Sequence, residues 1–231
     1  MKRTVIITGS TRGIGLATAT EFLQHGDQAV IFCRHKKHVK EAKDQLQRSV
    51  GSQEILCLVG DVRKAADVRM IVAQTLKRFS RIDILVNNAG IAAMKEIGSM
   101  TDALWNDILN TNLRGAFLFS REVIPAMKKQ GQGIIINVSS ILGIAGEGKF
   151  SAYCASKFGM IGLTQSLADE TTRHGIRVYA VLPWAVKTKL NAGLNLHLED
   201  SDMLRPEDVA QKIVRLAAGK MNSGACSKIY P

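Results

Sequence analysis

The sequence has few of the features that mark fibrous, disordered or membrane-spanning chains. Only 4 of its 231 residues are proline, and its 20 glycines have no collagen-like period. No run reaches the roughly 18 consecutive apolar residues of a membrane span. The apolar run that follows Lys2 and Arg3 is too short for a signal peptide. We therefore expect a folded chain with no membrane segment.

Cysteine is also scarce, and it lacks the spacing of a metal site or a disulfide framework. The four cysteines are scattered without a C-x-x-C pair, at Cys33, Cys57, Cys154 and Cys226. We predict no metal site, and we expect thiols packed as small apolar side chains in a reducing cytoplasm. A reactive thiol at Cys154 is the alternative interpretation.

Positive charge is in excess. The chain has 31 Lys and Arg against 20 Asp and Glu, a formal charge of +11, and 46% of its residues are hydrophobic. Its length and apolar content suit one domain with a substantial core, residues 1–231, and no change of composition marks a linker. The charge is compatible with nucleic acid, an anionic membrane surface, phosphorylated ligands or an acidic protein partner, and composition does not choose among them.

Strand-length apolar runs alternate with helix-length amphipathic stretches along most of the chain. We predict strands at residues 4–8, 28–33, 54–59, 82–87, 133–138 and 176–182, with a short last strand near 226–230. We predict helices at 14–24, 37–48, 64–77, 104–129 with a break, and 152–174, and one that begins near 205–208. Nearly continuous Val, Ile and Leu in several strands is typical of a parallel sheet covered on both faces. The pattern predicts an α/β, Rossmann-like, doubly wound parallel sheet of six to seven strands in three α/β/α layers.

A glycine-rich segment stands where the first strand should pass into the first helix. It reads Thr8-Gly9-Ser10-Thr11-Arg12-Gly13-Ile14-Gly15. Residues without Cβ permit a tight turn and close approach to a pyrophosphate, and the helix N-terminus offers free N–H groups and partial positive charge. We predict a dinucleotide site here. A glycine-rich turn that binds nothing is the alternative.

The end of the second strand carries cations. NAD-binding enzymes usually have an acid at this point, where it binds the ribose hydroxyls, but this chain reads Cys33-Arg34-His35-Lys36-Lys37. Arg34, with Arg12 of the glycine loop, would suit a 2′-phosphate. We therefore predict NADP(H) in preference to NAD(H). Lys36 and Lys37 are also explained as the solvated start of a helix.

Tyr153 and Lys157 lie four residues apart, on one face of a predicted helix. A fixed cation near a phenol lowers its pKa from about 10 and makes it a useful acid or base near neutral pH. The preceding strand brings Ser139 and Ser140 to its carboxyl end, where open α/β sheets bind ligands. The pattern predicts a catalytic site, and the alternative is an exposed helical pair.

Taken in order, these motifs resemble the short-chain dehydrogenase/reductase family over nearly the whole chain. The resemblance also includes Asp61-Val62 after the third strand, Asn87-Asn88-Ala89-Gly90 after the fourth, Asn112-Leu113-Arg114-Gly115, and Pro183 with Thr188 after the sixth. Each has a simpler reading. Asp61 could cap the helix that begins near residue 64, Asn87 and Asn88 could form a turn, and Asn112 could cap or break the long fourth helical stretch.

The resemblance implies an NADP(H)-dependent reductase of ketones or aldehydes. Tyr153 would be the general acid, Ser140 would bind the same carbonyl oxygen, and Lys157 would lower the pKa of Tyr153 and bind the nicotinamide ribose. Asn112 would hold a water of a proton relay, and Ser139 would be structural. The implied cofactor contacts are Gly9, Ser10, Arg12, Gly13, Ile14, Gly15, Arg34, Asp61, Val62, Asn88, Ala89, Gly90, Tyr153, Lys157, Val186 and Thr188.

Three segments depart from the family pattern. Trp184 follows Pro183 where the family usually has glycine, so its indole either borders the nicotinamide pocket or packs at the surface. Residues 189–204 are shorter than the usual substrate-covering segment, which predicts a more open site. The end of the chain lacks the family's Asp-Gly-Gly run, which puts a tetramer in doubt. An apolar helix face could still support a dimer or could face the sheet, and it consists of Phe158, Ile161, Leu163 and Leu167.

The resemblance to 3-oxoacyl-acyl carrier protein reductases suggests that an acidic carrier protein docks on Lys128, Lys129 and Arg173. For the two lysines, a favourable place at the negative end of a helix is the alternative. We expect a cytoplasmic homodimer or homotetramer that acts on a small carbonyl or alcohol substrate. A catalytically idle NADP-sensing regulator is the rival class. We do not expect nucleic-acid binding, because no helix-turn-helix, zinc or aromatic-basic pattern is present.

Overall fold

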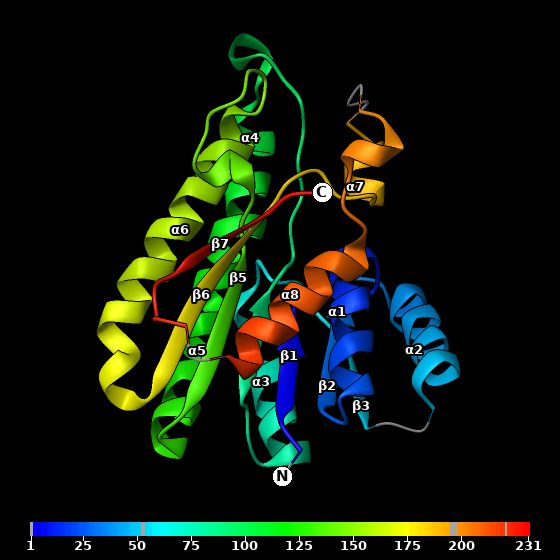
Figure 1. Cartoon of the computed structure of the whole chain (residues 1–231), viewed down its shortest axis with the longest axis vertical. Coiled ribbons are helices and arrows are strands. Elements are labelled where there is room, and N and C mark those ends of the chain that lie inside the picture. Colours follow the sequence, from blue (N-terminus) through cyan, green and yellow to red (C-terminus); the bar gives the residue numbers. More distant parts are fainter. Residues whose placement is uncertain (1, 52–53, 195–197, 220) are drawn as a thin grey trace.

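The computed structural model describes residues 2–51, 54–194, 198–219 and 221–231. Its strands form one parallel sheet in the order β3-β2-β1-β4-β5-β6-β7 (Figure 1). They are β1 (Thr4–Ile7), β2 (Gln28–Cys33), β3 (Ile55–Val59), β4 (Ile84–Asn87), β5 (Gly133–Val138), β6 (Ile176–Pro183) and β7 (Cys226–Ile229). The predicted doubly wound α/β fold and the short last strand are both confirmed.

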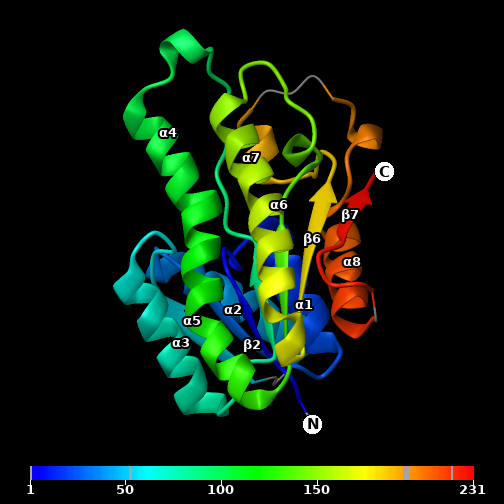
Figure 2. The ribbon, with the colours of Figure 1, turned by 90° about the vertical axis from the view of Figure 1, so that its left-hand side faces the viewer.

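Helices cover both faces of the sheet, as the apolar strands require (Figure 2). The helices α1 (Gly13–Gln24), α2 (Lys36–Val50) and α8 (Pro206–Ala218) share a buried cluster on one face, which includes Phe22, Leu46 and Ile213. The helices α3 (Ala65–Phe79), α5 (Gly115–Gln130) and α6 (Ser151–Thr171) share the cluster of the other face, which includes Ile71 and Phe119. The three predicted layers are therefore present.

The predicted break in the long fourth helical stretch is a turn of π-helix. The helix α4 (Asp102–Leu109) leads into this turn at Asn110–Arg114, and α5 follows without a loop. The chain also forms α7 (Lys189–Ala192), a short helix that the sequence reading did not predict. Turns of π-helix occur often at functional sites, because the extra residue redirects side chains.

The strand order creates a crevice between β1 and β4. The chain runs outward from β1 to β3 on one side and then returns to the other side of β1, where Ile7 of β1 pairs with Val86 of β4. Loops that leave neighbouring strands toward opposite faces leave space at this switch point, and open α/β sheets bind ligands there. The glycine loop follows β1, and Asn88–Gly90 follow β4.

Two expectations about the surface can be compared with the structure. Cys154 is buried and Cys33 and Cys57 are partly buried, but Cys226 is exposed on the edge strand β7, so that thiol is not packed as expected. Edge strands leave alternate side chains open to solvent. Within the described ranges, no helix is long and apolar enough to cross a membrane.

Candidate active site

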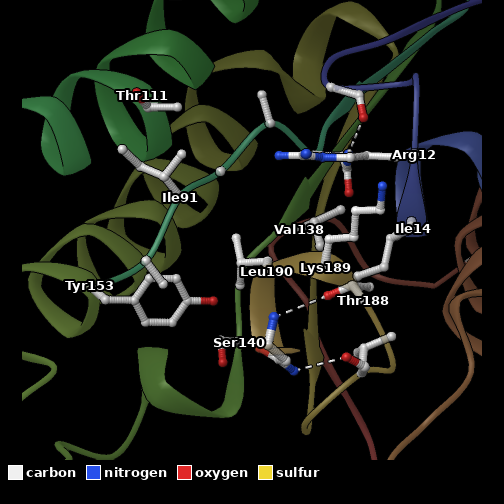
Figure 3. Close-up of a pocket in the computed structure, with 18 of the residues that line it drawn as sticks. Arg12, Ile14, Ile91, Thr111, Val138, Ser140, Tyr153, Thr188, Lys189 and Leu190 are labelled. Carbon is white, nitrogen blue, oxygen red and sulfur yellow. Dashed lines mark hydrogen bonds between the residues drawn. The ribbon is translucent and has the colours of Figure 1, made fainter. Parts of the chain in front are cut away.

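A cavity of about 850 Å³ lies along the carboxyl ends of the strands. Nearly all of the predicted site residues line it, from Arg12 and Arg34 to Tyr153 and Thr188. Ser10, Gly15 and Asn112 are the predicted residues that do not. In Figure 3 the Tyr153 ring extends into the cavity toward Ser140, and Arg12 and Ile14 lie on another side of it. The cavity therefore joins the glycine loop to the Tyr153 helix.

The glycine loop has the geometry of an anion cradle. Gly9 and Gly13 have φ of +64° and +52°, which only glycine adopts readily, and a Cβ on Gly9 would lie 3.0 Å from the Ala89 Cα. The N-terminus of α1 has no side-chain cap and no acid in its first turn, so its N–H groups and positive dipole end face the cavity uncompensated. These features fit the pyrophosphate of a dinucleotide.

Ser10 and Gly15 support this loop from behind. The Ser10 hydroxyl is buried and accepts the Phe32 N–H of β2 at 2.9 Å. A Cβ on Gly15 would lie 2.3 Å from the carbonyl oxygen of Gly9. On the β4 side, the Asn88 Nδ2 donates to the carbonyl oxygens of Thr8 and Gly9, at 2.9 and 3.3 Å. Ser10 and Gly15 thus shape the loop rather than the cavity wall.

Three cavity-lining side chains follow the end of β2, and Arg12 of the glycine loop lines the same cavity. Arg12 and Arg34 are exposed and line it, and so do His35 and His38, whose rings lie 5.3 Å apart. Lys36 and Lys37 do not line it. Lys37 faces solvent near Glu41, so the interpretation of these lysines as a solvated helix start is correct. The two histidines follow Arg34 directly, but sequence reasoning did not include them.

Asp61 is held by an arginine that the sequence analysis overlooked. The Arg63 Nη2 lies 2.7 Å from Asp61, and its Nη1 lies 2.8 Å from Asp107 of α4. Burial alone would raise the pKa of Asp61, but hydrogen bonds and charge from Arg63 outweigh burial and hold that pKa below its usual value. Asp61 does not cap α3, because the N-cap is Lys64 and no side chain caps it. Asp61, Val62 and Arg63 all line the cavity.

Tyr153 and Lys157 lie one turn apart at the start of α6, and Ser140 follows β5. The Lys157 side chain is only 4% exposed, and its Nζ donates to the Val138 carbonyl at 2.7 Å. The Ser139 hydroxyl donates to the Lys157 carbonyl at 2.9 Å, which fits the structural role expected of Ser139. These contacts fix α6 against the end of β5, so the phenol and the Ser140 hydroxyl face the same space (Figure 3).

Both ionisable groups of this pair are shifted toward their neutral forms. Burial raises the pKa of Tyr153 to about 12, although a hydrogen bond with Ser140 opposes that rise. Burial lowers the pKa of Lys157 to about 8. The Tyr153 pKa thus moves opposite to the expected direction, because desolvation dominates and the Lys157 ammonium is directed at Val138, with its Nζ 5.5 Å from the phenol ring centroid.

Asn112 lies behind the cavity wall, in the π-helical turn. Its side chain is buried, accepts the Ile91 N–H at 2.8 Å and donates to the Ile91 carbonyl at 2.9 Å. It also donates to the Ser156 hydroxyl at 2.9 Å. Asn112 therefore fixes the loop after β4 to α6. A role in holding a water stays a prediction.

The other end of the cavity is bordered by the segment after β6. Val186 is buried, and Thr188 caps α7 by accepting the Asn191 N–H at 3.4 Å. The Asn191 side chain donates to the Val186 carbonyl at 2.9 Å. A Cβ on Gly13 would lie 3.1 Å from Thr188, so this segment meets the glycine loop across the cavity. Of the expected short covering segment, residues 195–197 lie outside the described residues, and Leu190, Leu194 and Leu198 line the cavity.

Comparison with known proteins identifies the family. The sequence profile of the short chain dehydrogenases matches residues 3–199. The chain belongs to the short chain dehydrogenase family of oxidoreductases, whose members bind a nicotinamide cofactor.

Individual relatives are reductases. The chain is 33% identical to levodione reductase from Leifsonia aquatica over 219 residues, which is 94% of this chain and 81% of the relative. It is 34% identical to a 3-oxoacyl-[acyl-carrier-protein] reductase from Thermotoga maritima over 221 residues, 92% of this chain and 89% of the relative. The crystal structure of levodione reductase superposes with a TM-score of 0.93 at 30% identity, covering 99% of this chain and 96% of that one. An actinorhodin polyketide ketoreductase solved with NADPH gives 0.91 at 27% identity, with the same coverage.

Proposed function

We propose that this chain is an NADP(H)-dependent reductase that converts a ketone or aldehyde to an alcohol. The observation that carries the proposal is the arrangement of one cavity, with the Tyr153 and Ser140 hydroxyls together at one part and Arg12 and Arg34 at another. The bound nicotinamide cofactor would supply the hydride. The Ser140 hydroxyl would hydrogen-bond the substrate carbonyl oxygen and hold it against the phenol.

Tyr153 would give the phenol proton to that oxygen as negative charge develops on it. A pKa of about 12 keeps the phenol protonated throughout the neutral range, so the acid needed for reduction is present before the substrate arrives. Lys157 anchors the helix face that carries Tyr153, through its bond to Val138. Near pH 8 the Lys157 amine is partly uncharged. An anion bound beside it would therefore favour its charged form.

The preference for NADP(H) is supported by charge at the β2 end. The cavity lining includes Arg34 after β2 and Arg12 of the glycine loop, and charge-assisted hydrogen bonds from guanidinium groups favour a 2′-phosphate. Arg34 stands where an acid would favour the ribose hydroxyls of NAD. The similar actinorhodin ketoreductase, which was solved with NADPH, supports the same preference.

Reduction of an acyl group carried on an acidic carrier protein is the second candidate. It is supported by the name of the Thermotoga maritima relative. The cations proposed for docking lie far from Tyr153 within one chain. Lys128 and Lys129 end α5 and Arg173 follows the end of α6, whereas Tyr153 begins α6, a helix of 21 residues and roughly 30 Å. The acyl group of a carrier protein docked there would have to span that distance to enter the cavity of the same chain. We therefore favour a free carbonyl substrate.

We also propose a cytoplasmic homodimer. Two large apolar side chains, Phe117 on α5 and Phe158 on α6, are exposed, which favours a partner on this face. Ile161 and Leu167 belong instead to clusters packed on the sheet.

A substrate panel tests the proposed reaction. The protein is mixed with NADPH and a set of ketones, aldehydes and 3-oxoacyl thioesters, and nicotinamide absorbance is followed. We expect turnover of at least one free ketone or aldehyde, and Tyr153→Phe should lower kcat by about 100-fold or more while NADPH affinity changes little. Tight NADPH binding with no turnover on any compound would favour the idle regulator. Full turnover by Tyr153→Phe would refute the role of the phenol.

A further inference from the structure

Trp184 lines the cavity, but the proposed reaction gives its indole no role. It follows Pro183 at the carboxyl end of β6, lines the cavity and is 40% exposed. The ends of β5 and β6 are neighbours, since Val138 pairs with Val181 and the Ser139 N–H donates to the Val181 carbonyl at 2.8 Å. Ser140 and Trp184 therefore emerge from adjacent strand ends into one space.

The backbone of Trp184 and of the next residue, Ala185, is held by hydrogen bonds to two different segments. The Trp184 N–H donates to the Ile229 carbonyl at 2.9 Å, which continues the pairing of Pro183 with Ile229. On the other side, Leu204 donates to the Ala185 carbonyl at 2.9 Å. Behind the indole, the Tyr230 ring lies 6.2 Å away between centroids, tilted by 35°. The backbone that carries the indole is therefore fixed, and the indole lies beside a second aromatic ring.

Apolar side chains line the cavity together with Trp184. The same cavity is lined by Ile91, Leu142, Phe150, Leu190 and Leu194. An indole left 40% exposed beside such residues keeps apolar surface in water, and a flat apolar ligand would remove that surface from water. An aromatic ring would gain more binding free energy on the indole than a flexible chain of equal size. Two aromatic rings attract each other beyond the effect of buried area, and a ring loses less conformational freedom on binding.

We propose that Trp184 is a substrate-stacking residue that selects carbonyl compounds whose C=O is attached to a planar unsaturated ring. The ring would pack on the indole while the carbonyl oxygen meets Ser140 and Tyr153. The consequence for turnover rests on the proposed reductase function, whereas the contact between ligand and indole does not.

Three ketones of eight carbons separate stacking from simple bulk. They are acetophenone, with a planar ring, cyclohexyl methyl ketone, with a saturated ring, and 2-octanone, with a chain. In Trp184→Leu, we expect kcat/KM for acetophenone to fall about 2- to 10-fold, and for the other two to change less than twofold. Equal losses on all three would make Trp184 a framework residue and overturn the proposal, as would no loss on acetophenone. Trp184→Phe, which keeps a ring, should lose less and serves if the leucine variant does not fold.

Fluorescence tests the contact without turnover. The chain has 2 tryptophans, and Trp105 on α4 does not line the cavity. In Trp105→Phe saturated with NADP⁺, acetophenone should quench the remaining emission, that of Trp184, in a saturable way. In Trp184→Leu, where only Trp105 emits, saturable quenching should be absent. Failure of the native chain to reduce any of the three ketones would count against the proposed reaction on such substrates. Quenching of both variants alike, or of neither, would overturn the stacking proposal.

Discussion

At the scale of single residues, the proposed acid and its neighbouring lysine are both stabilised in their uncharged forms. Burial raises the pKa of Tyr153 and lowers that of Lys157, so burial disfavours a phenolate–ammonium pair. Such a buried lysine costs folding stability at neutral pH, because the charged form must be desolvated. Proteins commonly keep destabilising groups of this kind where function needs them.

Lys157→Met should therefore stabilise the cofactor-free protein. The lysine titrates near pH 8 when folded and near 10.5 when unfolded, so the native chain should gain stability as pH rises through that window. The methionine variant lacks this gain. At pH 7 we expect the free energy of unfolding of the variant to exceed that of the native chain by roughly 1–3 kcal/mol, after the loss of the hydrogen bond to Val138 is subtracted. Above about pH 10.5 the two free energies should be equal. Denaturant unfolding at several pH values measures this, and a variant less stable at pH 7 would contradict it.

At the scale of elements, the sequence predicted which strands and loops meet and most, but not all, of the residues that line the cavity. Spacing and apolar runs located the glycine loop, the Tyr153 helix and the parallel sheet. The family resemblance implied cofactor contacts at Ser10 and Gly15 and a water held by Asn112, and these three residues do not line the cavity. A motif identifies a turn, but the direction of each side chain depends on tertiary contacts, such as that of Ser10 with Phe32.

Tertiary contacts also explain why sequence reasoning missed some residues. Arg63 reaches Asp107, 44 positions away, and no local pattern predicts that contact. His35 and His38 lie three apart at the start of α2, a spacing that could have signalled a shared face next to Arg34. The π-helical turn was predicted only as a break, because Asn112 fixes it through a loop from another strand.

Gly15→Ala should disable the glycine loop. The added Cβ would meet the Gly9 carbonyl at 2.3 Å and the Asn88 side chain at 2.6 Å, so the loop must shift away from the cradle geometry. We expect NADPH affinity to fall at least 10-fold. Gly162→Ala on α6 is the matched control, since nothing lies within 4 Å of its added Cβ. That change should stabilise the helix by about 0.5–1 kcal/mol and leave NADPH affinity unchanged. Calorimetric titration measures the NADPH affinity of both variants, and equal affinities in the two would contradict the packing role of Gly15.

At the scale of the whole molecule, part of the +11 charge is concentrated around the cavity. Among the described residues, Arg12, Arg34, Arg63, Lys157, Lys187 and Lys189 line it, against the carboxylates of Asp61 and Glu147. A cleft lined by one sign of charge raises the local concentration of an opposite ligand and fades with added salt. General attraction and direct contact with a 2′-phosphate therefore need to be separated.

Arg34→Glu and Lys37→Glu make that separation, because they change the net charge equally and lie three residues apart. Arg34 lines the cavity, whereas the Lys37 side chain is 83% exposed and outside it. If Arg34 binds the 2′-phosphate directly, Arg34→Glu should weaken NADP⁺ binding about 10- to 100-fold and NAD⁺ binding less than threefold, the scale of a lost charge-assisted hydrogen bond. Lys37→Glu should affect both cofactors slightly and alike. When salt is raised from about 0.05 to 0.5 M, the native chain should lose more affinity for NADP⁺ than for NAD⁺. In Arg34→Glu, the salt-dependent losses for the two cofactors should be more nearly equal. Similar losses of NADP⁺ affinity in both variants would assign the preference to long-range charge instead of to Arg34.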